Sequence, residues 1–462
     1  MDFLHRVSQQ FGELECNDNS VVTVLGKSYG AIKGDTEQDE GGASGYGVFG
    51  QLFNRNFGWN RQFLADVESI IHFTYRTRFE PILRDPEGPS PLNFSTLFRD
   101  NPLNTLDNAL NHPDSFCSDI GWGCMIRTGQ TLLGNALQRL KLGREYRVPE
   151  NATSEILSSK ELELVSWFED KHDAPFSLHR FVEKGRKLSG KSAGEWFGPS
   201  ATSLSIKALV EEFGYESGID TCIISTDSAD VYEEEMDQVF DKKSEANILL
   251  LLGVKLGLSG VNERYWDSLK QLLASPQSVG ISGGRPSSSL YFFGLLEDYL
   301  LYLDPHSPQT DLAGIESPVE KLRSVHYARF NKMHISEMDP SMLIGVLIQG
   351  RDDWLQWRNS VENSQIFHVS ATRPQEFYLD DDDDVESLHS KEANKPLIGG
   401  DYVDVAPMVQ LAGVSRDDAY YDVKCKNQKI VVVGEYDNSA TDMEVDQVLV
   451  EQETVPVPEP AV

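Results

Sequence analysis

The chain has 462 residues, 40% of them hydrophobic, and a formal net charge of −32 at pH 7, a globular composition with the length for a sizeable core. Such an acidic chain argues against a nucleic-acid-binding protein, because phosphate contacts need clustered Lys and Arg. The five cysteines are scattered, which argues against a secreted disulfide framework, and no pair has the spacing of a zinc site. We therefore expect no metal and no cofactor.

The beginning of the chain has no basic segment followed by an apolar one, so no secretory signal is predicted. The most apolar run, Ile248–Val254, is too short to cross a bilayer and has the composition of a buried strand. Together these features favour a cytoplasmic protein.

The N-terminal part is predicted to be a flexible leader over residues 1–58, with one strand-like run at Val21–Leu25. Compact structure is expected to begin with Phe63–Ile71, whose apolar spacing predicts a short amphipathic helix. Phe73–Phe79 continues that helix or turns away from it. The Pro, Asn and Asp residues of Pro81–Asp119 predict mostly loop.

The stretch Asp119–Leu133 places Cys124 directly after a Gly-Trp-Gly sequence and before an apolar stripe of helical period. Cys124 is therefore expected in the first turn of a helix, where free backbone N–H groups and the helix dipole favour a thiolate. Gly121 and Gly123 lack a Cβ, which would let another backbone approach. The alternative is a buried structural cysteine at the start of a helix.

The remaining elements change from mostly helices to mostly strands along the chain, which predicts an α+β fold. Helices are expected at Glu161–Phe168, Phe176–Phe181, Ser203–Phe213 and Glu263–Leu273. Strands are expected at Thr221–Ser225, Ile248–Leu252, Val279–Ile281, Leu290–Phe293 and Leu300–Leu303. The segments Pro340–Ile348 and Asp353–Ser360 are expected to complete the globular part.

The C-terminal part is strongly acidic. Between Glu376 and Val462 there are 21 acidic and 6 basic residues, a net charge of −15, and Asp380–Asp384 is an unbroken acidic run. Aromatic residues are sparse and no long amphipathic period is present. Residues 373–462 are therefore predicted to be a disordered tail that follows a domain at 59–372.

A nucleophilic cysteine needs a base and a group that orients it. Asp304-Pro-His306 follows the strand-like run Leu300–Leu303, so the carboxylate and the imidazole are expected on the same face at the end of a strand. The alternative is an ordinary turn followed by a surface histidine. Four other histidines offer a base without a carboxylate two positions away: His72, His179, His326 and His334.

The Gly-Trp-Gly-Cys124 stretch followed far downstream by Asp304-Pro-His306 resembles the autophagins, cysteine proteases of autophagy with a papain-like fold. The resemblance covers about residues 60–360 and is nearest to the yeast members. Other blocks that resemble the family occur in the same order: Thr74–Arg76, Glu195–Pro199, Gly283–Gly294 and Ser336–Met342. The resemblance implies a papain-like α+β domain with a small auxiliary subdomain.

The resemblance also implies roles for individual residues. Cys124 would be the nucleophile, His306 the general acid and base, and Asp304 the group that orients His306. Tyr75 would help to stabilise the oxyanion. Residues that would gate the site are Trp196, over the active site, and a lid loop of Gly283, Gly284, Arg285 and Pro286. Without the resemblance, Tyr75 and Trp196 have the properties of core aromatics, and Gly283–Pro286 those of a turn.

The implied activity is cleavage of the ubiquitin-like autophagy modifier after its C-terminal glycine, and its release from phosphatidylethanolamine. The expected partner is that modifier, as precursor or lipid conjugate, with membrane contact only through the lipidated form. The expected location is the cytoplasm, with recruitment to the preautophagosomal structure and the nucleus as a second compartment. The alternatives are a non-catalytic adaptor that binds the modifier and an acyltransferase on a related thiol scaffold.

Two short patterns in the tail resemble motifs that add a strand to the edge of the modifier's sheet. Each has an aromatic residue, two intervening residues and an aliphatic residue, with acids nearby. The motif residues are Tyr402 and Val405 in the first pattern, and Tyr420 and Val423 in the second.

Overall fold

The computed structural model describes residues 20–30, 60–91, 110–148, 158–226, 228–326 and 329–374. The helices are α3 (Arg61–Glu68), α6 (Cys124–Leu142), α7 (Ser159–Ser166), α8 (Leu178–Ser189), α9 (Pro199–Phe213), α10 (Glu233–Phe240), α11 (Trp266–Ala274), α12 (Pro318–Arg323) and α13 (Arg351–Ser360). None of the described helices is long and apolar enough to cross a membrane.

The strands form one large mixed sheet and two small ones. The large sheet contains β1 (Val22–Val24), β2 (Lys27–Tyr29), β5 (Thr221–Ser225), β7 (Asn247–Lys255), β8 (Ser278–Arg285), β9 (Ser288–Leu296), β10 (Tyr299–Leu303), β12 (Asn331–His334) and β13 (Ser341–Gln349). The small sheets contain β3 (Arg76–Leu83), β4 (Ser115–Ser118) and β11 (Gln309–Thr310), and β6 (Asp230–Tyr232) with β14 (His368–Ser370).

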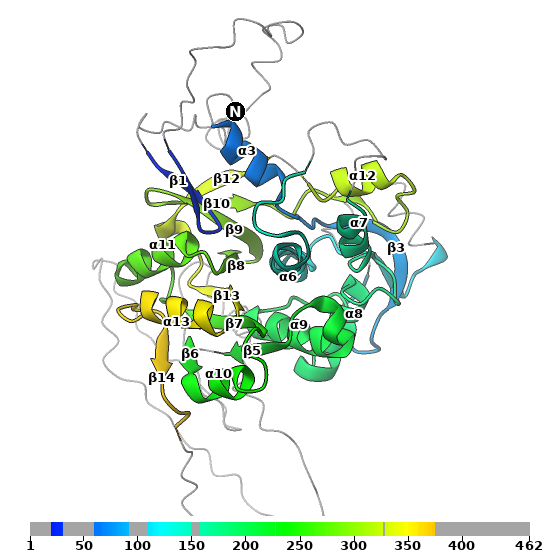
Figure 1. Cartoon of the computed structure of the whole chain (residues 1–462). Helices are drawn as coiled ribbons and strands as arrows, with labels where there is room; N and C mark the ends of the chain where they lie inside the picture. The colour runs from blue at the N-terminus through cyan, green and yellow to red at the C-terminus, as the bar shows by residue number, and fades with distance from the viewer. Residues whose placement is uncertain are drawn as a thin grey trace, which may run out of the picture. The chain divides into compact units, whose positions relative to one another are not determined.

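The large sheet has the strand order β12-β10-β9-β8-β13-β7-β5. β1 pairs with the last residues of β9, Gly294–Leu296, which follow the part of β9 that pairs with β8. Neighbouring strands are antiparallel except β5 and β7, which are parallel. Both faces are covered, and Figure 1 shows α6 end-on between the strands and the helices α7 and α8. Helices and strands are thus combined as the predicted α+β class requires.

The two faces of the sheet separate two hydrophobic clusters because side chains alternate along a strand. In β7, Leu249 and Leu251 pack with α6 and α9, whereas Leu250 and Leu252 pack on the other face with α10, α11 and α13. A strand buried on both faces has few polar positions, which explains the apolar run Ile248–Leu252.

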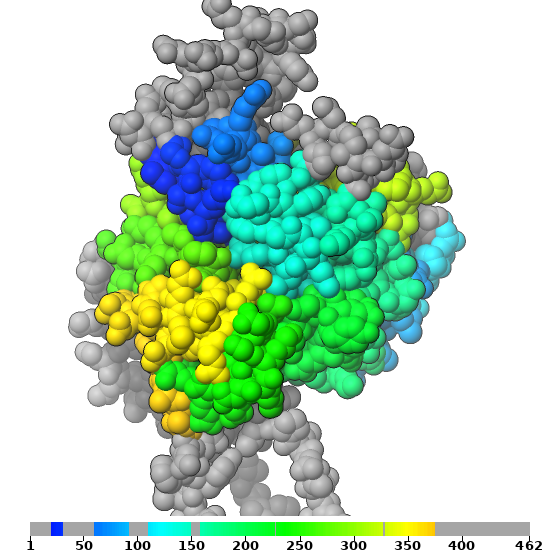
Figure 2. Space-filling model, viewed as in Figure 1, coloured from blue at the N-terminus to red at the C-terminus, as the bar shows by residue number. Residues whose placement is uncertain are grey.

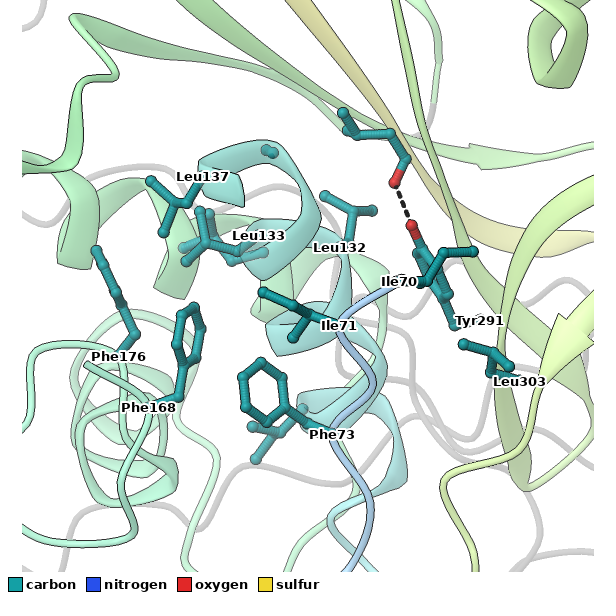
Figure 3. Packing of buried hydrophobic residues seen from close by; sticks show 14 of the residues in the cluster. Ile70, Ile71, Phe73, Leu132, Leu133, Leu137, Phe168, Phe176, Tyr291 and Leu303 are labelled. Carbon is teal, nitrogen blue, oxygen red and sulfur yellow. Dashed lines mark hydrogen bonds between the residues drawn. The ribbon is translucent and has the colours of Figure 1, made fainter. Parts of the chain in front are cut away.

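Helix α6 is the most enclosed helix of the fold. It begins at Cys124, as predicted, has 19 residues, and most of its side chains are buried. Figure 3 shows Leu132, Leu133 and Leu137 packed among side chains that include Phe168 and Phe176. Because both sides of α6 are covered, the position of its first residue is fixed by packing along its whole length.

The N-terminal hairpin β1–β2 belongs to the folded domain. β1 pairs with β9, and Val22 and Val24 are fully buried. Arg144, just after α6, donates a 2.7 Å hydrogen bond to the carbonyl oxygen of Val24 and pairs with Asp66 of α3. Figure 2 shows the hairpin against residues of α3 and the end of α6. The predicted strand is confirmed, but the expected flexible leader over 1–58 is wrong for residues 20–30.

The region Pro81–Asp119 is loop over most of its described residues, as expected, but it also contains strand residues. Its described residues include the end of β3 and all of β4, which pair across a register shift between Thr77 and Ile82. The pairing joins segments more than thirty residues apart, and a pattern confined to one segment does not reveal such a partner.

Gly345 of β13 tests how tightly α6 is packed on the sheet. A Cβ at this position would lie 2.7 Å from Val279 Cγ2 and 2.8 Å from Leu132 Cδ2. We expect Gly345→Ala to destabilise the domain by about 1–3 kcal/mol through overpacking, measured as a lower midpoint of thermal unfolding of the full chain.

Gly253→Ala is the matched control, since Gly253 lies in the paired strand β7 and its added Cβ would come no closer than 3.6 Å to the Ser225 carbonyl oxygen. Equal losses of stability in the two variants would contradict the packing argument.

Candidate active site

The turn before α6 positions Cys124. The N–H groups of Trp122 and Gly123 donate to the Asp119 carbonyl oxygen at 3.2 and 2.9 Å, and the Trp122 indole donates to the Ser118 carbonyl oxygen at 3.0 Å. Gly123 is the N-cap of α6, so Cys124 is its first residue, as predicted. The Cys124 side chain is fully buried at this end of the helix.

Glycine is required at the two positions of this turn for different physical reasons. Gly121 is exposed and has a φ of 89°, a left-handed conformation that glycine adopts without strain. Gly123 is buried, and a Cβ there would lie 2.6 Å from Asp119 Oδ2. The expectation that both glycines leave room for another chain is therefore wrong for Gly123, whose space is occupied by Asp119.

Asp304 and His306 lie together directly after β10, as the sequence predicts. His306 Nδ1 donates to Asp304 Oδ1 at 2.6 Å, and the His306 backbone N–H reaches the same oxygen at 2.9 Å. The carboxylate thus fixes the tautomer, and Nε2 remains for the hydrogen bond between His306 and Cys124. The structure assembles the predicted triad.

Burial lowers the pKa of His306, but hydrogen bonds to Asp304 and Cys124 and attraction to both outweigh it, so the pKa rises to about 9. Burial acts in the opposite direction on Asp304, where the hydrogen bonds from His306 prevail and hold the pKa of the carboxyl below its usual value. His306 is therefore protonated at neutral pH, beside a charged carboxylate.

Tyr75 contacts both members of the thiol–imidazole pair. It hydrogen-bonds to Cys124, and its ring meets the His306 ring edge to face with centroids 5.2 Å apart. Its backbone N–H donates to the Pro305 carbonyl oxygen at 2.8 Å. Burial, with the charges of Cys124 and Asp119, raises the pKa of Tyr75, so its hydroxyl stays a neutral hydrogen-bond donor.

A buried network behind the triad was not found from the sequence. Asp119 accepts a 2.6 Å hydrogen bond from the Arg76 backbone N–H and a second, also 2.6 Å, from Arg127 Nε. Arg127 Nη1 lies 2.8 Å from Asp170 Oδ1, and the side chains of this ion pair are fully buried. The available signal was Arg127, the one charged residue in the run Cys124–Gln138.

The expected lid loop is largely a strand. Gly283, Gly284 and Arg285 end β8 and pair with β9, and only Pro286 and Ser287 form the turn. Just after its turn, the hairpin lies against the first turns of α6: Ser289 Oγ is 3.2 Å from Met125 Sδ and 2.7 Å from Thr128 Oγ1. The hairpin therefore packs beside the residue that follows Cys124.

Trp196 lies in the connection between α8 and α9, and its side chain is 38% exposed. Among the described residues it has no hydrogen bond or ring contact with the triad or with Tyr75. The tail motif residues Tyr402, Val405, Tyr420 and Val423 lie outside the described part of the chain.

The geometry is that of a thiol nucleophile with an oriented base, and comparison with known proteins identifies the family. The peptidase C54 catalytic domain matches residues 60–360. The chain is 50% identical to the probable cysteine protease ATG4 of Eremothecium gossypii, over 99% of this chain and 89% of the relative. The chain belongs to the peptidase C54 family. The predicted resemblance to the autophagins is confirmed.

Two other relatives of this C54 protease agree with the assignment. It is 47% identical to the probable cysteine protease ATG4 of Kluyveromyces lactis, over 98% of this chain and 99% of the relative. It is 48% identical to the cysteine protease ATG4 of Saccharomyces cerevisiae, over 92% and 88% respectively. The protein is a cysteine-type protease with a papain-like α+β domain, and the predicted fold and enzyme class are confirmed.

The pKa of His306 gives a direct test of the triad. The ordinary pKa of histidine is 6.5, and below that pH His306 is protonated in both the folded and the unfolded chain. There its full contribution to the free energy of unfolding is present. This contribution is lost as the pH rises through about 9, the pKa in the folded chain. We expect Asp304→Asn to move the folded pKa down toward 6.5, because the neutral amide cannot stabilise an imidazolium. The measurement is an NMR titration of the His306 ring in the full-length C54 protease.

Asp298→Asn is the matched control, since Asp298 pairs with Lys270 in the turn before β10 rather than with His306. A His306 midpoint that stays near 9 in Asp304→Asn would refute the assigned electrostatic role of Asp304.

Proposed function

We propose that this protease cleaves the ubiquitin-like autophagy modifier after its C-terminal glycine, both in the precursor and in the phosphatidylethanolamine conjugate. The observation that carries the proposal is the assembled Cys124–His306–Asp304 triad in a chain of the C54 family. The relatives are named cysteine proteases, and the resemblance to the autophagins supplies the substrate class.

Both reactions break the amide bond of a glycine carbonyl. The Cys124 sulfur attacks that carbonyl, and the negative charge moves to the oxygen. Protonated His306 then gives its Nε2 proton to the departing amine, which is either a peptide amine or the lipid headgroup amine. In the second half of the reaction, water attacks the thioester carbonyl and His306 takes a proton from that water. The carbon–sulfur bond then breaks, the glycine carboxylic acid is released, and the Cys124 sulfur is left beside protonated His306, as at the start. One arrangement thus serves maturation and delipidation.

Access to Cys124 must be created by the substrate, because the side chain is fully buried. We propose that the exposed Trp196 and the β8–β9 hairpin end at Gly283–Pro286 move to admit the chain end. A terminal glycine needs the least space of any residue, and this supports selection for glycine beside the sulfur. The membrane is reached only through the lipidated substrate, since the net charge of −32 opposes attraction to anionic lipids.

The decisive experiment incubates the full chain with a modifier that carries a C-terminal fusion, and in parallel with the phosphatidylethanolamine conjugate on vesicles. We expect a product whose mass ends at the glycine in both arms, and none with Cys124→Ala. The products are identified by mass spectrometry.

Cys222→Ala is the matched control for the loss of a buried thiol, since Cys222 lies in β5 outside the site. Cleavage that survives in Cys124→Ala, or a product that ends elsewhere, would refute the proposal. Binding without cleavage by the unmodified chain would support an adaptor, and a product that requires an added amine would support an acyltransferase.

The tail motifs are proposed as a second contact with the modifier, in which Tyr402 with Val405, and Tyr420 with Val423, add a strand to its sheet. The same assay examines them through a Tyr402→Ala/Tyr420→Ala double variant, which should raise KM and leave kcat unchanged.

Tyr75 is proposed to donate a hydrogen bond to the developing oxyanion. Its buried hydroxyl remains protonated and lies at Cys124, where the carbonyl would be attacked. We expect Tyr75→Phe to lower kcat by roughly 10²-fold with little change in KM, as for removal of one oxyanion donor. Steady-state cleavage of the fusion substrate measures both constants.

Tyr29→Phe is the control, because the Tyr29 hydroxyl donates to Asp66 at 2.6 Å, away from the triad. If Tyr75→Phe changed the unfolding temperature while kcat remained that of the unmodified enzyme, Tyr75 would have a structural role only.

A further inference from the structure

A second cluster of side chains that can bind a metal ion lies where β3, the α7–α8 connection and α8 meet. One ligand atom each from Glu80, His172 and His179 falls within 4.8 Å of the other two. Glu80 belongs to β3, His172 to the connection between α7 and α8, and His179 to the first turn of α8. We propose that these three residues form a binding site for a divalent transition metal, with Zn²⁺ as the occupant.

The tautomer of His179 leaves a metal-binding lone pair. His179 Nε2 lies 2.6 Å from the Glu80 carbonyl oxygen, which only accepts, so Nε2 carries the proton and Nδ1 does not. Nδ1 is buried and has no hydrogen-bond partner in the described structure, and the residue is 4% exposed. A histidine that binds metal usually donates its other N–H to a carbonyl or carboxylate in this way.

A buried acceptor without a hydrogen-bond partner destabilises the folded chain. A metal bound at His179 Nδ1 would satisfy it.

The other two ligands can close around the metal. Glu80 and His172 are exposed, and the rings of His172 and His179 have centroids 4.5 Å apart. Zn–N bonds of about 2.0–2.1 Å in a tetrahedron place ligand atoms roughly 3.3 Å apart. The existing separations therefore need only a small rotation of exposed side chains, and the same exposure gives the ion an entry path.

The ligand chemistry favours zinc over the harder cations. Two imidazole nitrogens and one carboxylate oxygen suit Zn²⁺, whereas Ca²⁺ and Mg²⁺ prefer sets of oxygen ligands. A water molecule would complete the fourth position. The expectation of no metal rested on cysteine spacing; these ligands are instead His and Glu, and His172 and His179 lie 92 and 99 positions after Glu80.

The proposed site would tie β3 to α8. The ladder between β3 and β4 is interrupted between Thr77 and Ile82, and Glu80 lies within that interruption. A metal bridge from Glu80 to His179 would replace the missing strand contact and hold the segment against α8. We therefore infer a structural role for the bound metal.

The test uses the full chain with Cys124→Ala, so that the thiol–imidazole pair cannot bind the ion. Metal is removed with a chelator, and ZnCl₂ is then titrated by calorimetry, with thermal unfolding measured in parallel. We expect one equivalent to bind and to raise the unfolding temperature. His172→Ala or Glu80→Gln should weaken Zn²⁺ binding at least tenfold. Because both side chains are exposed, we expect these variants to keep the fold.

His368→Ala is the matched control, since His368 is an exposed histidine on β14. Co²⁺ in place of Zn²⁺ identifies the ligands: four-coordinate visible bands without a thiolate charge-transfer band would support the His-Glu set. Equal Zn²⁺ affinity in His172→Ala and His368→Ala, no binding, or a thiolate band would overturn the proposal.

Discussion

The carboxylate of Asp119 joins the two segments on which the chemistry depends. One oxygen accepts the backbone N–H of Arg76, directly after Tyr75, and the other accepts Arg127 Nε of α6. The turn that leads to Cys124 is thereby fixed to the strand that follows Tyr75. Loss of one partner from a fully buried ion pair costs about 3–5 kcal/mol, whereas an exposed pair contributes about 0–1 kcal/mol. The geometry of the nucleophile therefore rests on a charge network that contains none of the reacting atoms.

Local patterns in the sequence were sufficient for the elements that carry the triad. The apolar stripe after Cys124 predicts α6, and the run before Asp304 predicts β10 with both side chains at its end. The pairing of β1 with β9, the β3–β4 pairing and the Arg127–Asp170 ion pair were missed. Each of these contacts joins segments that are far apart in the chain. The apolar period of a helix (3.6 residues) or of a strand (2.0 residues) shows which face of that element is buried, but not which distant segment packs against it.

Enclosure of the site acts on the pKa of His306 in two opposite ways: burial by itself lowers the pKa, but the partners held beside the ring raise it more. Enclosure removes water from the pair, which strengthens both the Asp304 hydrogen bond and the attraction to the sulfur. The same enclosure excludes a substrate, so the site must open before it can react. Motion of the β8–β9 hairpin is restricted by its ladder and by Ser289 at Thr128. Opening is therefore expected at the hairpin end, Gly283–Pro286, rather than at Ser289, which contacts α6.

The proposed metal site and the triad share the segment from Tyr75 to Glu80 but no side chain. Tyr75 is held at one end through its backbone bonds to Pro305 and Gln309. The other end lies where the pairing with β4 is interrupted. We therefore expect a metal at Glu80 to influence catalysis through the motion of β3, the segment that the two sites share. Its direct effect is expected in stability, because binding to the folded chain alone raises the free energy of unfolding.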